Sequence, residues 1–328
     1  MDRQPATAVV VEPFRELFRS IVANVATVVR GKDSTVELAV ICLLSEGHLL
    51  IEDVPGVGKT TLAKALARSF DLECHRIQFT PDLLPSDVTG VSLYNRDTTS
   101  FSFRPGPIFA NVVIADEINR ASPKTQSALL EAMQERQVST DDMTRPLPEP
   151  FMVVATQNPV EHEGTYPLPE SQIDRFLMRL SLGYPDKASE LAMLVAAGEV
   201  SAGPEVLPVV ADRGTVLAMI RAVKAVYVAG SLREYIVELA SATRHNPAIT
   251  LGMSPRSTLA LQRAAQGLAA SAGRTYVTPD DIKTVFAPVV AHRIVLQPSL
   301  VASGAEVGDI LREVERSIRV PAGRTSAI

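Results

Sequence analysis

Apolar residues in the first 185 positions gather in short runs that alternate with longer amphipathic stretches. Runs of strand length lie at 48–51, 76–79, 111–115, 151–155 and 176–182. After the first of these, apolar and small side chains recur with helical spacing from Leu62 to Ser69. Strand-length runs that alternate with helical patterns predict a parallel sheet in an α/β domain.

The pattern changes near Tyr184, and strand-like runs are almost absent beyond it. Ser254 and Pro255 supply an N-cap and a first-turn proline for one helix, and Thr278 and Asp281 have capping-box spacing for the next. We therefore expect a second domain that is all-helical. The expected organisation is a disordered lead-in over 1–12, the α/β domain over 13–185, the helical domain over 186–313 and a tail over 314–328.

Composition and charge narrow the class of protein. The chain has 328 residues, 46% of them hydrophobic, and a formal charge of −5, which together favour a folded protein over a general binder of nucleic acid or anionic membrane. Its two cysteines, Cys42 and Cys74, exclude a disulfide framework. No apolar run approaches the ~18–20 residues of a membrane span, and the N-terminus has no signal-peptide pattern, so we expect a cytoplasmic protein.

A phosphate-binding loop is predicted between the first strand and the helix after it. Gly56 and Gly58 allow the backbone to approach phosphate oxygens. Lys59 supplies a positive charge to the β and γ phosphates, and Thr60 supplies a hydroxyl group to Mg²⁺. Asp53 departs from the general pattern, which has glycine at that position.

Polar residues follow two other predicted strands. Asp116 and Glu117 end the run at 111–115, where one carboxylate suits a Mg²⁺ site and the next suits the polarisation of water. Asn158 follows the run at 151–155, where its amide suits a hydrogen bond to the γ-phosphate and the attacking water. A simple turn at Asn158 is the alternative.

Two arginines lie at positions where an anionic partner would explain a positive charge. Arg256 falls in the first turn of its predicted helix, where the macrodipole disfavours a cation, so a bound phosphate or full solvation would explain it. Arg175 lies between a predicted helix and a strand, and a structural ion pair with Asp174 is the alternative to a functional role. The five histidines and two cysteines show no metal-ligand spacing.

Together these motifs resemble the AAA+ superfamily and, within it, the MoxR family, from about Val29 to Arg293. The most specific stretches are 46–60, 106–121, 155–159, 164–170 and 254–257. The resemblance implies a P-loop NTPase fold with a three-layer αβα domain and a parallel sheet, followed by a smaller all-helical lid. It also implies a helix-2 insert at about 88–103 and a pre-sensor-1 hairpin at about 138–148.

The resemblance assigns roles to single residues. Those implied to contact the nucleotide are Val29, Gly56, Val57, Gly58, Lys59, Thr60 and Thr61. Those implied to hold Mg²⁺ are Thr60 and Asp116. The implied catalytic set is Glu117, Lys59, Asn158 as sensor 1, Arg256 as sensor 2, and Arg175 as an arginine finger that reaches the next subunit. Arg120 is a further candidate for that interface.

The function implied by this resemblance is Mg²⁺-dependent ATP hydrolysis between subunits of a hexameric ring, coupled to chaperone-like maturation of a client protein. A von Willebrand factor A domain protein is the expected partner. A metal-chelatase ATPase subunit and a nucleotide-gated scaffold with little turnover remain alternatives. A nucleic-acid motor is disfavoured by the net charge and by the few basic and aromatic residues in the inserts.

Overall fold

The computed structural model describes residues 11–97, 99–140, 143–158, 164–196 and 203–321. Its contacts separate two compact units, which are described here one at a time. Residues 19–218 form the α/β unit, and the described residues up to Phe18 pack with those from Met219 onward into the helical unit. These limits differ from the expected domain bounds of 13–185 and 186–313, which remain a prediction.

The α/β unit is built on a five-stranded parallel sheet with the order β2-β5-β8-β1-β9. The strands run over Leu49–Glu52 (β1), Cys74–Gln78 (β2), Val112–Asp116 (β5), Met152–Gln157 (β8) and Met178–Leu180 (β9). Each overlaps one of the apolar runs in the sequence. The predicted parallel sheet is therefore confirmed.

Helices cover both faces of this sheet. Every residue of β5 is buried, and successive strand residues point to opposite faces, so neither face of the central strands is open to solvent. On one face Val113 and Val153 share a core with Leu129 and Leu130 of α5. The helical elements that lie wholly or partly in this unit are α1 (Val11–Ala26), α2 (Asp33–Leu44), α3 (Lys59–Ser69), α4 (Pro85–Thr89), η2 (Ile118–Arg120), α5 (Pro123–Glu135), α6 (Glu170–Ile173), α7 (Lys187–Ala196), η3 (Pro204–Val206) and α8 (Arg213–Ala225). The boundaries of the unit fall within α1 and α8.

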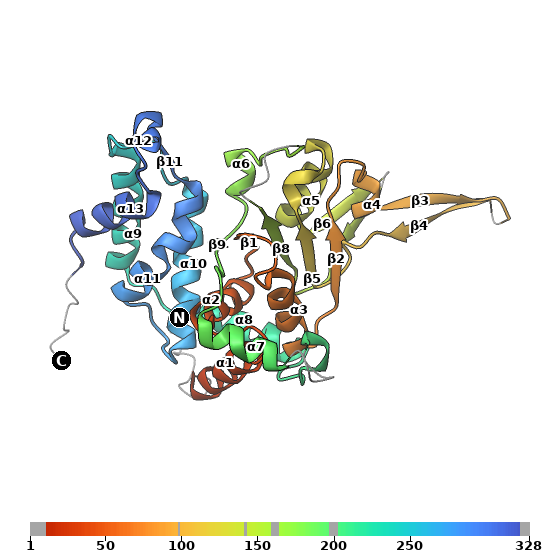
Figure 1. The fold of residues 1–328 in the computed structure, drawn as a ribbon, viewed down its shortest axis with the longest axis horizontal. Coiled ribbons are helices and arrows are strands. Elements are labelled where there is room, and N and C mark those ends of the chain that lie inside the picture. Colours follow the sequence, from red (N-terminus) through yellow and green to blue (C-terminus); the bar gives the residue numbers. More distant parts are fainter. Residues whose placement is uncertain (1–10, 98, 141–142, 159–163, 197–202, 322–328) are drawn as a thin grey trace, which may run out of the picture. The chain divides into compact units, whose positions relative to one another are not determined.

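Two antiparallel hairpins are added to the α/β unit. β3 (Gly90–Asn95) pairs with β4 (Ser100–Pro105), and this hairpin extends far from the sheet (Figure 1). β6 (Gln137–Thr140) pairs with β7 (Met143–Pro146). They lie where the two inserts are expected.

The helical unit contains α9 (Gly230–His245), α10 (Pro255–Ser271), α11 (Pro279–Val290), η4 (Ala291–Arg293), α12 (Pro298–Ala302) and α13 (Val307–Ser317). The caps predicted from the sequence are present. Ser254 accepts a hydrogen bond from the Ser257 N–H at 3.1 Å, and Asp281 accepts one from the Thr278 N–H at 2.7 Å.

The sequence pattern missed one feature of the helical unit. A small antiparallel sheet joins β10 (Ile249–Leu251) to β11 (Val295–Leu296), and strands of three and two residues are too short to produce a periodic pattern. At the chain ends, α1 begins at Val11, within the expected lead-in, and α13 continues to Ser317, within the expected tail. No helix among the described residues is both long enough and apolar enough to cross a membrane.

Candidate functional site

The loop between β1 and α3 has the backbone conformation that its glycines favour. Gly56 and Gly58 have φ values of +84° and +96°, in the left-handed region where a side chain is strained. Gly58 is the N-cap of α3 and has no side chain to satisfy the first N–H groups of the helix. The loop therefore ends in a helix N-terminus that attracts an anion.

Lys59 is the first residue of α3, and backbone carbonyl groups hold its ammonium group. Its Nζ donates to the carbonyl oxygen of Asp53 at 2.7 Å and to that of Gln157 at 3.3 Å. These two acceptors lie at the ends of β1 and β8, the neighbouring strands of the sheet. The lysine charge is thus fixed above the carboxyl end of the sheet by main-chain atoms.

The structure gives a reason for Asp53, the departure from the general loop pattern. Oδ2 of this buried carboxylate accepts hydrogen bonds from Ser181 Oγ at 2.9 Å and from the N–H groups of Leu182 at 2.7 Å and Gly183 at 2.6 Å. Oδ1 accepts the Val54 N–H at 2.9 Å. Burial alone would raise the pKa of Asp53, but these hydrogen bonds outweigh it and hold that pKa below its ordinary value. Asp53 therefore ties the loop to the segment after β9.

Asp116 is the last residue of β5, the strand between β2 and β8, and Glu117 directly follows it. The hydroxyl group of Thr156 links them, because it donates to Asp116 Oδ1 at 2.6 Å and accepts the Glu117 N–H at 2.9 Å. Glu117 has a φ of +55°, a left-handed conformation that is uncommon and strained for a residue with a side chain. This turn takes Glu117 out of the line of the strand.

Three further side chains hold the two carboxylates, and of these the sequence analysis singled out only Arg120, for another role. Arg76 Nε and Nη2 donate to Asp116 Oδ2 at 3.0 and 2.6 Å, and Nη2 also donates to Gln78 Oε1 at 2.7 Å. Gln78 Nε2 in turn donates to Glu117 Oε2 at 2.9 Å. Arg120 Nη1 donates to the same Glu117 oxygen, also at 2.9 Å. One connected network therefore joins both acidic residues.

The loop and the acidic pair line one pocket of about 330 Å³. Its lining residues come from the phosphate-loop segment and from the ends of two strands: Pro55, Gly56, Gly58, Lys59, Thr60, Thr61, Asp116, Glu117 and Asn158. All except Pro55 are residues that the sequence analysis proposed for the site. A cation and a helix N-terminus thus share one pocket with carboxylates, an arrangement that suits a polyphosphate chain with a divalent cation.

The residues present fit a magnesium site. The Thr60 hydroxyl and the Asp116 carboxylate line the same pocket and offer the oxygen ligands that Mg²⁺ prefers. In the part of the chain that the structure describes, no group of three or more His, Cys, Asp or Glu side chains could hold a metal. Such a site takes only one or two protein ligands when phosphate oxygens complete the coordination.

The other predicted site residues lie elsewhere. Val29 is buried and belongs to the segment that connects α1 to α2, and Val57 belongs to the phosphate loop. Neither residue lines the pocket. Arg175 lies between α6 and β9, also outside the lining. Arg256 is the second residue of α10 in the helical unit, where its side chain is exposed.

The sequence matches two models of known protein families. Residues 48–178 match the ATPase family associated with various cellular activities, and residues 241–314 match the AAA lid domain.

Proteins similar over most of the chain include YeaC of Bacillus subtilis, which is 48% identical over 315 residues, 96% of this chain and 98% of that one. Chaperone MoxR1 of Mycobacterium tuberculosis is 39% identical over 91% of this chain and 81% of its own length. Protein MoxR of Methylorubrum extorquens is 33% identical over 91% of this chain and 93% of its own length. A crystal structure of a candidate ATPase from Cytophaga hutchinsonii has a TM-score of 0.88 and 39% identity, and the match covers 94% of this chain and 96% of that one.

Proposed function

Because this chain belongs to the MoxR family of AAA+ ATPases, we propose that it hydrolyses ATP with Mg²⁺ at the interface between subunits of a hexameric ring. The single observation that carries this proposal is the pocket in which the phosphate loop faces Asp116 and Glu117. Membership of the family implies that the chain binds a nucleotide. The proposal of hydrolysis rests on Asp116 and Glu117, whose carboxylates suit a metal ion and an attacking water.

Five of the residues that line the pocket have a part in the proposed reaction. Lys59 and the first N–H groups of α3 bind the β and γ phosphates. Thr60 and Asp116 hold Mg²⁺, which when bound neutralises charge on the phosphate oxygens. Glu117 orients the attacking water and accepts its proton, and Asn158 holds that water against the γ-phosphate.

Two arginines complete the proposed site from outside the pocket. Arg175 does not line the pocket of its own chain, which supports the proposal that it reaches the nucleotide of a neighbouring subunit. Arg256 is proposed to act from the helical unit as sensor 2. An arginine supplied by a neighbour accelerates phosphoryl transfer by ~10³–10⁵ in related mechanisms, so an isolated subunit should hydrolyse ATP poorly.

The proposed use of this energy is the maturation of a client protein, together with a von Willebrand factor A domain partner. One relative is named a chaperone, and the hairpin of β3 and β4 offers a surface for a protein client. Leu93, Tyr94 and Phe101 on this hairpin are 47%, 54% and 75% exposed. Since neighbouring strand residues point to opposite faces, apolar side chains are exposed on both faces of the hairpin.

The test compares the chain with its Glu117→Gln variant. Glu117→Gln should retain ATP binding and lose turnover by ~10²–10⁴, the usual contribution of a general base. Glu131→Gln, an exposed position on α5, is the matched control and should keep full activity. The measurements are binding of a fluorescent ATP analogue and steady-state phosphate release. Equal turnover by Glu117→Gln and the unchanged chain would remove the catalytic assignment, and near-zero release by the unchanged chain would favour the scaffold alternative.

A further inference from the structure

Both oxygens of the Asp116 carboxylate are engaged by other groups of the protein. Thr156 donates its hydroxyl hydrogen to Oδ1, and Arg76 donates to Oδ2 through both Nε and Nη2. The side chain of Asp116 is 13% exposed, whereas that of Arg76 is 50% exposed. The hydrogen bonds from the partly exposed Arg76 can therefore be exchanged for another partner more readily than the buried hydrogen bond from Thr156.

This arrangement competes with the metal-binding role of Asp116. A magnesium ion, or a water molecule bound to it, needs a lone pair of this carboxylate. A guanidinium group that donates twice to Oδ2 takes up that oxygen, and its positive charge repels a divalent cation nearby. Arg76 and the metal are therefore alternative counterions for the same side chain.

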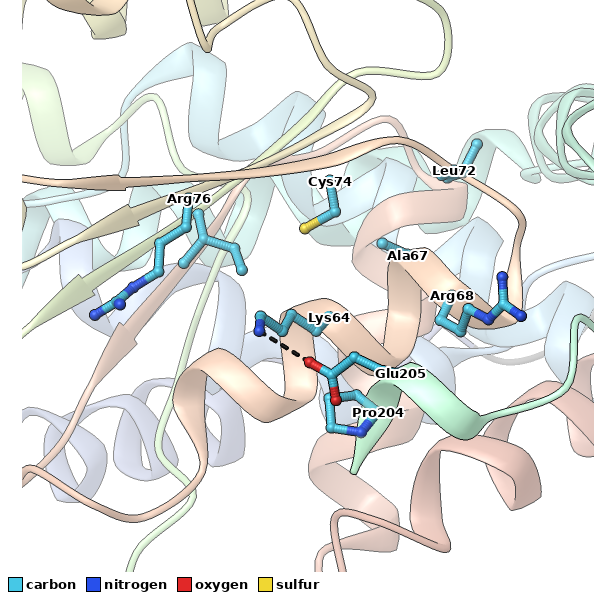
Figure 2. Close-up of a pocket in the computed structure, with 9 residues that line it drawn as sticks. Lys64, Ala67, Arg68, Leu72, Cys74, Arg76, Pro204 and Glu205 are labelled. Carbon is cyan, nitrogen blue, oxygen red and sulfur yellow. Dashed lines mark hydrogen bonds and ion pairs between the residues drawn. The ribbon is translucent and has the colours of Figure 1, made fainter. Parts of the chain in front are cut away.

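A second cavity gives Arg76 space away from Asp116. This cavity has a volume of about 300 Å³, on the order of ten water molecules, and Arg76 lines it together with Lys64, Arg68 and Cys74. Figure 2 shows Arg76 at one end of the cavity, apart from the ion pair that Lys64 forms with Glu205. Arg76 lies on β2, an outer strand of the sheet. Its side chain therefore has an open flank.

The same guanidinium group also affects Glu117. Arg76 Nη2 holds the side-chain carbonyl of Gln78 at 2.7 Å, and the amide group of Gln78 holds Glu117 at 2.9 Å. Withdrawal of Arg76 would free the carbonyl end of Gln78 and so loosen the hold on Glu117. A change in the partner of Asp116 would therefore also change how firmly the carboxylate of Glu117 is held.

We propose that Arg76 is a positioning residue that is hydrogen-bonded to Asp116 before the metal arrives and moves away from this carboxylate when Mg²⁺ binds with the nucleotide. This inference rests on the proposed function, since it assumes that Asp116 serves the metal. Arg76 then lowers the affinity for the divalent cation.

The test measures metal affinity in the full chain with a non-hydrolysable ATP analogue, using Mn²⁺ as the probe and electron paramagnetic resonance as the readout. Arg76→Met should bind Mn²⁺ about fivefold more tightly than the matched control Arg68→Met, the upper range for a partly exposed ion pair. Arg68→Met removes the same charge from the same cavity, but its Nε donates to the carbonyl oxygen of Leu207 rather than to a carboxylate. Equal or weaker Mn²⁺ binding by Arg76→Met would overturn the inference.

A second measurement needs no variant. A crystal structure of the unchanged chain with Mg²⁺ and the analogue should place the Arg76 guanidinium beyond hydrogen-bonding distance of Asp116, and retention of that contact would overturn the inference. If the unchanged chain binds neither the analogue nor Mn²⁺, the proposed function fails and the inference fails with it. If it binds both and Arg76→Met behaves like Arg68→Met, the inference alone fails.

Discussion

The two walls of the candidate site are held in different ways. On the phosphate-loop wall, Lys59 is fixed by two backbone carbonyl groups and Asp53 by three backbone N–H groups and one hydroxyl. On the acidic wall, Asp116 and Glu117 are held mainly by the side chains of Arg76, Gln78, Arg120 and Thr156.

The phosphate-loop wall is therefore already arranged for its ligand, whereas the acidic wall must exchange hydrogen bonds when the ligand binds. Backbone donors and acceptors keep their places, so the loop is ready to receive phosphate without rearrangement. The side chains on the acidic wall satisfy carboxylates that the proposed reaction needs for a metal ion and a water molecule. We infer that nucleotide binding leaves the first wall unchanged and reorganises the second.

The largest effect on ATP turnover is expected at Arg175, which belongs to neither wall. Arg175→Ala should lower steady-state ATP turnover by ~10³–10⁵, because the proposed transition state loses the cation supplied by a neighbour. ATP binding should change little. Arg179→Ala, a nearby arginine paired with Glu52, is the control and should retain most of the activity. Full activity in Arg175→Ala would show that the two walls suffice without a neighbour.

A smaller effect is expected on the prearranged wall. Asp53→Asn should lower the free energy of unfolding by about 1.5–3 kcal/mol near neutral pH, because the buried carboxylate loses its charge-assisted hydrogen bonds. Chemical denaturation monitored by circular dichroism measures this change. If the variant is as stable as the unchanged chain, the tether between the loop and the segment after β9 contributes little.

The pH dependence gives this tether a second test. The pKa of Asp53 is depressed in the folded protein, so its contribution to stability is present above its ordinary value of 3.8 and is lost as the pH falls through the lower folded value. The stability difference between the unchanged chain and Asp53→Asn should therefore shrink below about pH 4. A difference that stays constant down to the acid transition would contradict this assignment.

The smallest effect is expected from loosening the acidic wall. Gln78→Ala removes one hydrogen bond from Glu117 and should raise basal turnover about threefold, since a single hydrogen bond is worth about 0.5–1.5 kcal/mol. Phosphate release at saturating ATP measures this change. A fall in turnover would mean that Gln78 supports the active position of Glu117 and does not restrain a resting one.

Much of the α/β fold could be predicted because buried parallel strands have continuous apolar sequences. The candidate residues Lys59, Asp116 and Asn158 could be grouped because the carboxyl ends of parallel strands meet at one edge of the sheet. The family resemblance assigned a role to each of these residues, which the spacing of residues alone does not do.

The rest depended on contacts between distant segments. Arg76 and Gln78 reach the acidic pair because β2 pairs with β5, and a sequence pattern does not reveal which strands become neighbours. The role of Asp53 was also hidden, because its partners beyond the adjacent Val54 lie about 130 positions further along the chain. Strand pairing and tethers of this kind are set by tertiary packing.

Mixed rings test the central claim most directly. Lys59→Ala removes a group that a subunit gives to its own nucleotide, and Arg175→Ala removes the group that we propose it gives to its neighbour's. Each variant alone should be nearly inactive, but in a mixture some interfaces combine an intact Lys59 with an intact Arg175. ATP turnover that rises when the two inactive variants are mixed is the predicted result, and turnover that stays at the level of the separate variants in co-assembled rings would contradict a site shared between subunits.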